Sequence, residues 1–100
     1  MFVLKDYIPE EKLIKLCREN HIRRLSLFGS ALRDELGPDS DIDILIEFEE
    51  EHVPGLLTIA AIEIELSELA GKKVEVTTPD ELSRYFRDEV VSHARVEYVA

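Results

Sequence analysis

The sequence predicts a small α/β sandwich, a few-stranded mixed sheet backed by helices on one face. Segments of helical periodicity alternate with short segments of period two, in the order α-β-α-β-α-β-α. One hundred residues suffice for a single core, so residues 1–100 are expected to form one domain. The composition, 45% apolar and 34% charged, is typical of an ordinary globular protein.

The first half of the chain begins with a helix and a strand. An apolar stripe at i, i+3 and i+4 predicts a helix over about Pro9–Glu19, and Cys17 lies on it, which favours a packed thiol over a reactive one. The run Ile22–Gly29 predicts the first strand. A short helix is expected over Ala31–Leu36, ended by the turn residues Gly37-Pro38.

A second strand is predicted over Asp41–Phe48. Its period of two gives one wholly apolar face, which should lie against helices, and one face that starts polar, where a site would open. The apolar face carries Ile42, Ile44, Ile46 and Phe48, and the other carries Asp41, Asp43, Leu45 and Glu47.

The second half repeats the alternation. The longest helical pattern covers Leu56–Ala70, a third strand is predicted over Lys73–Thr77, and a capping-box pattern predicts a last helix over about Pro79–Ala94. The tail Val96–Val99 is expected to be extended. The last helix should make its apolar contacts through Leu82, Tyr85, Phe86 and Val90.

Two features predict a magnesium-dependent nucleotide site. Gly29 and Ser30 lie between a strand and a helix N-terminus, where free backbone N–H groups and the helix dipole favour phosphate. Asp41 and Asp43, at i and i+2 on a strand, share one face, and Glu75 is expected on the same face one strand away. Three carboxylates on one uncovered face are costly unless a divalent metal neutralises them.

These residues also have ordinary structural roles as alternatives. Gly29 is equally a strand-to-helix turn residue, and Ser30 equally a helix N-cap. Arg33 lies one helical turn after Ser30, where it reaches the same phosphates or forms a surface ion pair. Glu47 shares the strand face of the two aspartates, so it is an alternative metal ligand to Glu75.

The remaining composition bears on partners and location. A net charge of −10 disfavours direct nucleic-acid binding and fits a basic protein partner, with a solvated acidic surface as the alternative. The single Cys17 excludes an internal disulfide. With no apolar run of about 20 residues and no signal-peptide core, no membrane association and a cytoplasmic location are expected. His21, His52 and His93 are scattered, which predicts structural or solvated roles rather than a metal site.

The motif residues resemble a known family. Phe28-Gly29-Ser30, ten residues, then Asp41-Ile42-Asp43 is similar to the signature of the DNA polymerase beta-like nucleotidyltransferase superfamily. The later segment 71–79 resembles its smallest members, the minimal nucleotidyltransferases (MNT). The resemblance covers nearly the whole chain and implies that residues 1–100 form a single minimal nucleotidyltransferase domain.

The resemblance implies a role for each motif residue. Asp41 and Asp43 correspond to the carboxylates that bind two Mg²⁺ ions. Glu75 corresponds to a third carboxylate that completes one metal site and helps to deprotonate the attacking hydroxyl. Gly29 and Ser30 correspond to the pair that holds the triphosphate of ATP.

Two positions depart from the family pattern. The Gly-Ser pair is often followed there by Arg-x-Arg-Gly, of which this chain keeps only Arg33, a further candidate for phosphate binding, followed by Asp34. The third carboxylate is usually Asp, whereas Glu75 is longer by one carbon–carbon bond, or roughly 1.5 Å.

Minimal nucleotidyltransferases are known as antitoxins of HEPN-domain ribonuclease toxins, and transfer AMP from ATP onto a toxin tyrosine. The resemblance therefore implies a magnesium-dependent nucleotidyltransferase that modifies a hydroxyl of a HEPN-type toxin partner. A non-catalytic antitoxin that masks its toxin and a transferase acting on a small molecule are the alternatives. The sequence leaves the acceptor, the nucleotide preference and homo-oligomerisation open.

Overall fold

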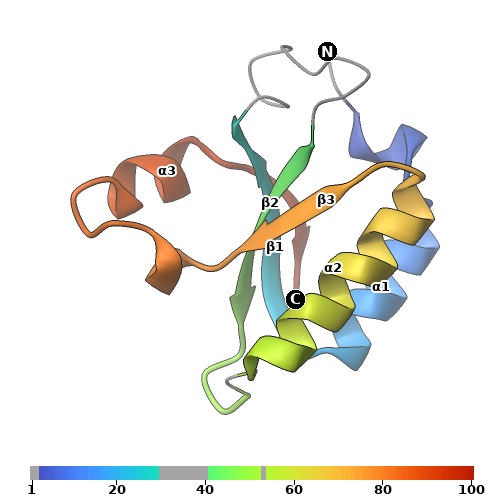
Figure 1. Ribbon diagram of the computed structural model, residues 1–100, viewed down its shortest axis with the longest axis horizontal. Coiled ribbons are helices and arrows are strands. Elements are labelled where there is room, and N and C mark those ends of the chain that lie inside the picture. The colour runs from blue at the N-terminus through green and yellow to red at the C-terminus, as the bar shows by residue number, and fades with distance from the viewer. Residues whose placement is uncertain (1–2, 30–40, 53) are drawn as a thin grey trace.

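The computed structural model describes residues 3–29, 41–52 and 54–100, which form a four-stranded sheet with helices packed against it (Figure 1). The strand order is β3-β2-β1-β4, in which β1 is antiparallel to both β2 and β4, and β2 is parallel to β3. The sheet is therefore mixed, as predicted. The elements are η1 (Leu4–Asp6), α1 (Glu10–Glu19), β1 (Ile22–Phe28), β2 (Ile42–Phe48), α2 (Leu56–Ala70), β3 (Val74–Thr77), η3 (Pro79–Glu81), α3 (Arg87–His93) and β4 (Arg95–Val99).

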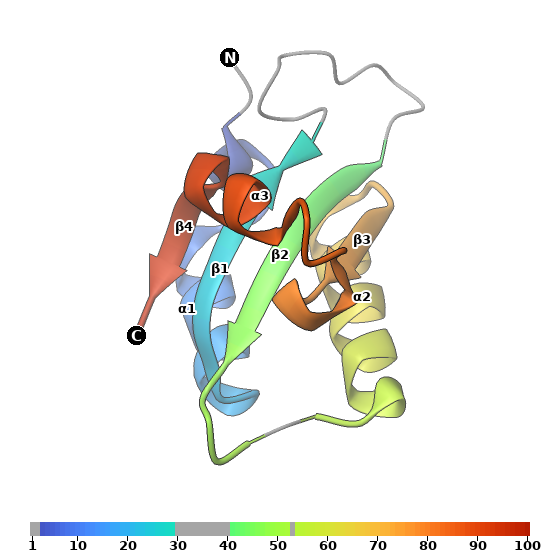
Figure 2. The same cartoon turned by 90° about the vertical axis from the view of Figure 1, so that its left-hand side faces the viewer.

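The two longer helices lie side by side on one face of the sheet. The views in Figures 1 and 2 both place α1 and α2 on this face and the short α3 on the other, over β1 and β4. Because β2 and β3 are parallel, the chain must cross over between them, and α2 makes this crossing. The face opposite α1 and α2 is covered only in part.

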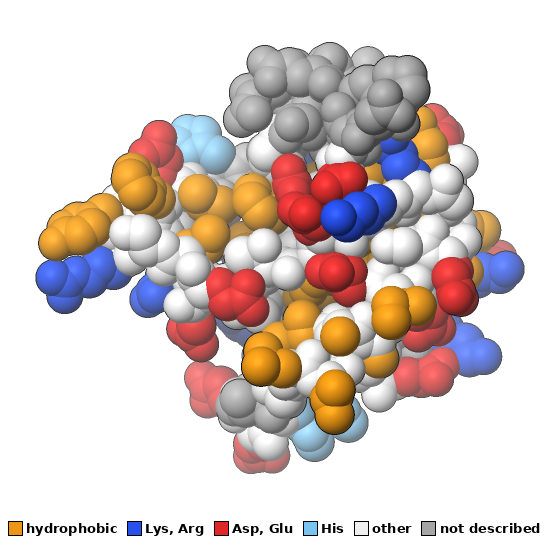
Figure 3. Space-filling model, in the orientation of Figure 1, with side chains coloured by type: hydrophobic (Ala, Val, Ile, Leu, Met, Phe, Trp, Pro, Cys, Tyr) orange, Lys and Arg blue, Asp and Glu red, His pale blue; other side chains and the backbone are white. Residues whose placement is uncertain are grey.

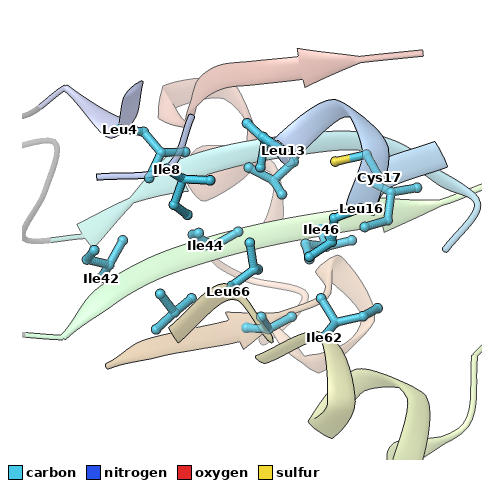
Figure 4. Close-up of a cluster of buried hydrophobic side chains, with 14 of the residues drawn as sticks. Leu4, Ile8, Leu13, Leu16, Cys17, Ile42, Ile44, Ile46, Ile62 and Leu66 are labelled. Atoms are coloured by element: carbon cyan, nitrogen blue, oxygen red, sulfur yellow. The ribbon is translucent and has the colours of Figure 1, made fainter. Parts of the chain in front are cut away.

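The core fills the space between the sheet and these two helices (Figure 4). Ile42, Ile44 and Ile46 of β2 point toward α1 and α2 and are fully buried. This confirms the apolar strand face that the alternation predicted. Cys17 is also fully buried, which confirms the packed thiol, and burial raises the pKa of its thiol to about 12.

Most predicted boundaries agree with the structure to within one or two residues. The strands β1, β2, β3 and β4 and the helices α1 and α2 all fall where the periodicity placed them. The helix predicted over Ala31–Leu36 lies outside the described residues. No helix in the part of the chain that the structure describes has the length and apolar character needed to cross a lipid bilayer.

The last predicted helix is wrong in its extent. Instead of one helix over Pro79–Ala94, a single 3₁₀ turn is followed by a break and then by α3. The Arg87 side chain donates hydrogen bonds to the carbonyl oxygens of Pro79, at 2.8 Å, and Leu82, at 3.2 Å. It thus satisfies acceptors that helical N–H groups would otherwise use. Tyr85 and Phe86, expected to be apolar contacts, are 78% and 61% exposed.

The packing of the core predicts that two leucines of α2 contribute very differently to the free energy of unfolding. Leu66 is fully buried against the sheet, and Leu57 is 88% exposed. We expect Leu66→Ala to lower the free energy of unfolding by about 2–5 kcal/mol, because it leaves a cavity. The matched Leu57→Ala variant should stay within about 0.5 kcal/mol of the parent. Urea denaturation of both variants measures the difference, and equal losses would contradict this packing.

Candidate active site

Two of the candidate carboxylates lie in one row across the sheet, and a third lies two residues before one of them. In the strand register, Phe28 of β1 is the partner of Asp43 in β2, and Asp43 is in turn the partner of Glu75 in β3. Asp41 precedes β2, two residues before Asp43, and therefore lies on the same face. This is the face opposite the core. The structure thus brings Asp41, Asp43 and Glu75 together at one end of neighbouring strands.

Gly29 follows β1 directly and lies against Asp43. Its φ is +72°, in the left-handed region that residues with a Cβ seldom adopt. A Cβ built on Gly29 would come within 2.5 Å of the Asp43 Oδ2 atom. The backbone conformation therefore favours glycine here, and a Cβ would also force the Asp43 carboxylate to shift.

A lysine that the sequence analysis did not assign to the site lies between two of the carboxylates. The Lys73 Nζ atom is 3.8 Å from Asp41 Oδ2 and 3.8 Å from Glu75 Oε1. Figure 3 shows acidic side chains gathered beside a basic one on the face that carries β3. The signal was present in the sequence, because Lys73 precedes Glu75 by two residues and so shares its face. Lys73 neutralises part of the negative charge that the three carboxylates concentrate here.

Helix α2 fixes the strand that carries Glu75. The backbone N–H of Val74 donates to Ser67 Oγ at 2.9 Å, and that of Val76 donates to Glu63 Oε2 at 2.8 Å. Both acceptors are side chains of α2. They accept the backbone hydrogen bonds that the outer edge of β3 would otherwise offer to another strand. Glu75 lies between these two anchored residues, with its half-exposed side chain on the face of Asp43. The sequence analysis missed this role of Ser67 and Glu63.

Glu47, the alternative to Glu75, lies at the other end of β2 and has other partners. Arg23 Nη2 donates to Glu47 Oε1 at 2.9 Å, and Arg24 Nε is 3.4 Å from Glu47 Oε2. Its side chain is only 14% exposed. The structure therefore favours Glu75 as the third carboxylate near the aspartates. Ser30 and Arg33, the other phosphate-binding candidates, lie outside the described residues.

The donor chemistry of the carboxylates fits a hard divalent cation, since Mg²⁺ prefers oxygen ligands. Within residues 3–29, 41–52 and 54–100, however, only the donor atoms of His21, Glu49 and His52 lie, as a set of three, within 4.8 Å of one another. The Asp41, Asp43 and Glu75 carboxylates are further spread, with Lys73 among them. Because the Lys73 side chain is 66% exposed, it can turn into solvent and leave these oxygens to a cation.

The histidines differ from their prediction. His21 and His52 were expected to be separate and without metal-site geometry, but their rings stack at a centroid distance of 3.7 Å. Sequence spacing gave no sign of this contact, because pairing of β1 with β2 joins segments about 30 residues apart. This second group of donors lies at the opposite end of β2 from Asp41.

Comparisons with known proteins identify the family. The family model of the nucleotidyltransferase domain matches residues 10–97. A Methanocaldococcus jannaschii protein, provisionally named a protein adenylyltransferase, is 35% identical over 85 residues, covering 85% of this chain and 89% of the relative. A solved structure provisionally described as a minimal nucleotidyltransferase superposes with a TM-score of 0.71 at 33% identity, covering 85% of each chain.

A further match, at 20% identity, shows likeness of fold alone. It is a chain in the structure of a tri-AMPylated Shewanella oneidensis HEPN toxin in complex with an MNT antitoxin. The TM-score is 0.68, and the match covers 98% of this chain and 74% of the other.

The fold, the row of carboxylates and the matched domain define the class of protein, and the chain belongs to the nucleotidyltransferase family. It is an enzyme of that class, as the Gly-Ser and Asp-x-Asp motif predicted. Within the family, its similarity to the minimal nucleotidyltransferase structure places it among the minimal members.

Gly29 provides a first test of the site. We expect Gly29→Ala to lower the free energy of unfolding by at least about 1–2 kcal/mol, because Ala is strained at positive φ. It should also weaken binding of ATP with Mg²⁺, because the new methyl group displaces the Asp43 carboxylate. Calorimetry and thermal melting measure both effects.

Gly55→Ala is the matched control for that variant. Gly55 has a φ of −81° and open space around its Cβ position, so its substitution should cost less than about 1 kcal/mol and leave nucleotide binding unchanged. Equal effects of the two substitutions would contradict the close approach of Gly29 to Asp43.

Lys73 provides a second test. We expect Lys73→Gln to raise the affinity for Mn²⁺ about fivefold, because the lysine competes with a cation through two exposed ion pairs worth roughly 0.5 kcal/mol each. Lys15→Gln removes the same charge from a distant ion pair with Glu19 and should change the affinity little. Unchanged Mn²⁺ affinity in Lys73→Gln would show that the lysine does not compete with the cation.

Proposed function

We propose that this protein is a magnesium-dependent adenylyltransferase that transfers AMP from ATP to a tyrosine hydroxyl of a HEPN-type toxin, and thereby acts as its antitoxin. The observation that carries the proposal is the pairing of Asp43 with Glu75 across β2 and β3, with Gly29 against Asp43 and with Asp41 on the same face. This arrangement occurs in a chain whose family transfers nucleotides.

Each residue has a distinct task in the proposed site. Asp41 and Asp43 hold two Mg²⁺ ions, with Glu75 as the third carboxylate. Bound Mg²⁺ neutralises charge on the triphosphate and on the reacting oxygens. Gly29 lies against Asp43 with no intervening side chain, and we assign its backbone turn to hold the triphosphate beside the metal ligands. Lys73, displaced from Asp41 and Glu75, is free to pair with phosphate oxygens on the same face.

The proposed transfer is an in-line displacement at the α-phosphorus of ATP. The tyrosine oxygen forms a new bond to this phosphorus, and the bond from the phosphorus to the bridging oxygen breaks. Pyrophosphate leaves with the bonding electrons. Glu75 accepts the proton of the tyrosine hydroxyl, which makes the attacking oxygen a better nucleophile.

Surface properties support a protein acceptor. The net charge of −10 attracts a basic protein and repels nucleic acid. Tyr85 and Phe86, neighbours in the chain, are both largely exposed, and a protein partner would cover this apolar surface. The structure of a tri-AMPylated HEPN toxin in complex with an MNT antitoxin is an example of such an acceptor, bound to a protein of similar fold.

One observation favours a second candidate, an antitoxin that masks its toxin without catalysis. Lys73 lies between Asp41 and Glu75 and neutralises part of the charge that a metal would otherwise neutralise. If this arrangement persists in the complex, the acidic surface binds the toxin and no AMP is transferred.

Incubation of the purified chain with the HEPN-type protein encoded beside it, labelled ATP and Mg²⁺ separates the two candidates. We expect a mass gain of whole AMP units on a partner tyrosine, and its loss when EDTA removes the metal. Asp43→Asn should reduce the rate at least about a hundredfold, because it disturbs the centre of the site. Asp80→Asn, which changes an exposed aspartate of η3, is the matched control and should leave the rate unchanged.

A tight inhibitory complex without a mass change, persisting in Asp43→Asn, would establish the masking antitoxin instead. Absence of any binding between the two proteins would contradict both candidates.

A further inference from the structure

Two histidines and a glutamate form a compact group far from the carboxylates of the candidate active site. Donor atoms of His21, Glu49 and His52 all lie within 4.8 Å of one another. His21 Nδ1 is 3.4 Å from Glu49 Oε2, and the His21 and His52 rings stack at 3.7 Å with an interplanar angle of 5°. All three side chains are exposed and open to ions in solution.

The backbone holds the three residues in place. The Glu49 N–H donates to the His21 carbonyl oxygen at 3.0 Å, which joins the turn before β1 to the end of β2. The His52 N–H donates to the Glu49 carbonyl oxygen at 2.9 Å and closes a turn. His21 has a φ of 55° and is the one non-glycine residue with positive φ in the described part of the chain. Its ring therefore projects from a fixed, left-handed backbone position.

We propose that His21, Glu49 and His52 form a second metal site, which binds a Zn²⁺-like transition-metal ion and not Mg²⁺. Imidazole nitrogens suit Zn²⁺, Cu²⁺ and Ni²⁺, whereas Mg²⁺ prefers oxygen ligands and keeps its waters. Two histidines and a carboxylate are an established Zn²⁺ ligand set, with water in the fourth position. His21 and His52 border a shallow depression of about 230 Å³, also lined by Glu19 and Thr58, which admits that water.

The stacked rings determine how the metal-bound form must differ from the metal-free structure. An imidazole nitrogen binds a metal in the plane of its ring, so two parallel rings cannot both direct a nitrogen at one ion. One ring has to turn about its Cβ–Cγ bond, a broad and soft torsion. Donor atoms around a tetrahedral Zn²⁺ lie about 3.4 Å apart, so small side-chain rotations complete the site. Metal binding therefore opens the His21–His52 stack.

The position of this site separates it from nucleotidyl transfer. Glu49 follows the last residue of β2, whereas Asp41 precedes the first, so the two sites lie at opposite ends of one strand. A bound ion would tie the turn between α1 and β1 to the connection between β2 and α2. We therefore expect Zn²⁺ to raise the melting temperature with no need for ATP.

Calorimetric titration of metal-free protein with ZnCl₂ tests the proposal. The experiment uses the Asp41→Asn/Asp43→Asn variant, so that the carboxylates of the candidate active site do not contribute. We expect one equivalent of Zn²⁺ to bind, with shifts of the His21 and His52 imidazole NMR signals that MgCl₂ does not produce. His52→Ala should weaken binding at least about tenfold, because loss of even an outer-shell partner has effects of this size.

Two further variants make the result decisive. His21→Asn removes a ligand while keeping a residue that tolerates positive φ, so the fold should be retained and Zn²⁺ affinity lost. His93→Ala changes an exposed histidine of α3 and should bind Zn²⁺ as the parent does. Equal Zn²⁺ affinity in all three histidine variants, or unshifted His21 and His52 signals, would overturn the proposal. Because the test requires neither ATP nor toxin, its outcome is independent of the proposed transfer reaction.

Discussion

The register of β2 against its two neighbours is the constraint on which the rest of the structure depends. It pairs Phe28 with Asp43 and Asp43 with Glu75, and so brings the turn at Gly29 and two carboxylates into one row. The same register turns Ile44 and Ile46 toward α1 and α2. A slip of one residue would bury the aspartates and expose the isoleucines. Core packing and site geometry are therefore fixed by one set of backbone hydrogen bonds.

Concentration of negative charge is the electrostatic consequence of this register. Three carboxylates gather at one end of β2 and β3, and Lys73 lies within ion-pair distance of two of them. Exposed pairs of this kind are weak, so a cation and a triphosphate can replace them at small cost. The outer edge of strand β3 is held separately from these ion pairs, by Ser67 and Glu63 of α2.

The two ends of β2 differ in chemistry. Oxygen donors gather where the strand begins, whereas nitrogen donors from His21 and His52 gather with Glu49 just beyond its end. Between these two groups of donors, Glu47 forms ion pairs with Arg23 and Arg24. The strand thus separates a region suited to hard cations from one suited to transition metals.

The sequence by itself determined the strands, the two longer helices and the face that carries the candidate carboxylates. Period-two alternation defined β2 and the faces of Asp41 and Asp43, and helical periodicity defined α1 and α2, because these patterns are local. It did not determine that Pro79–Ala94 breaks into η3 and α3, since the break depends on hydrogen bonds from the Arg87 side chain. Only the tertiary structure placed Lys73 between Asp41 and Glu75, Gly29 against Asp43, and His21 upon His52. The physical reason is that strand order and register join residues far apart in the chain, and no local pattern encodes those distances.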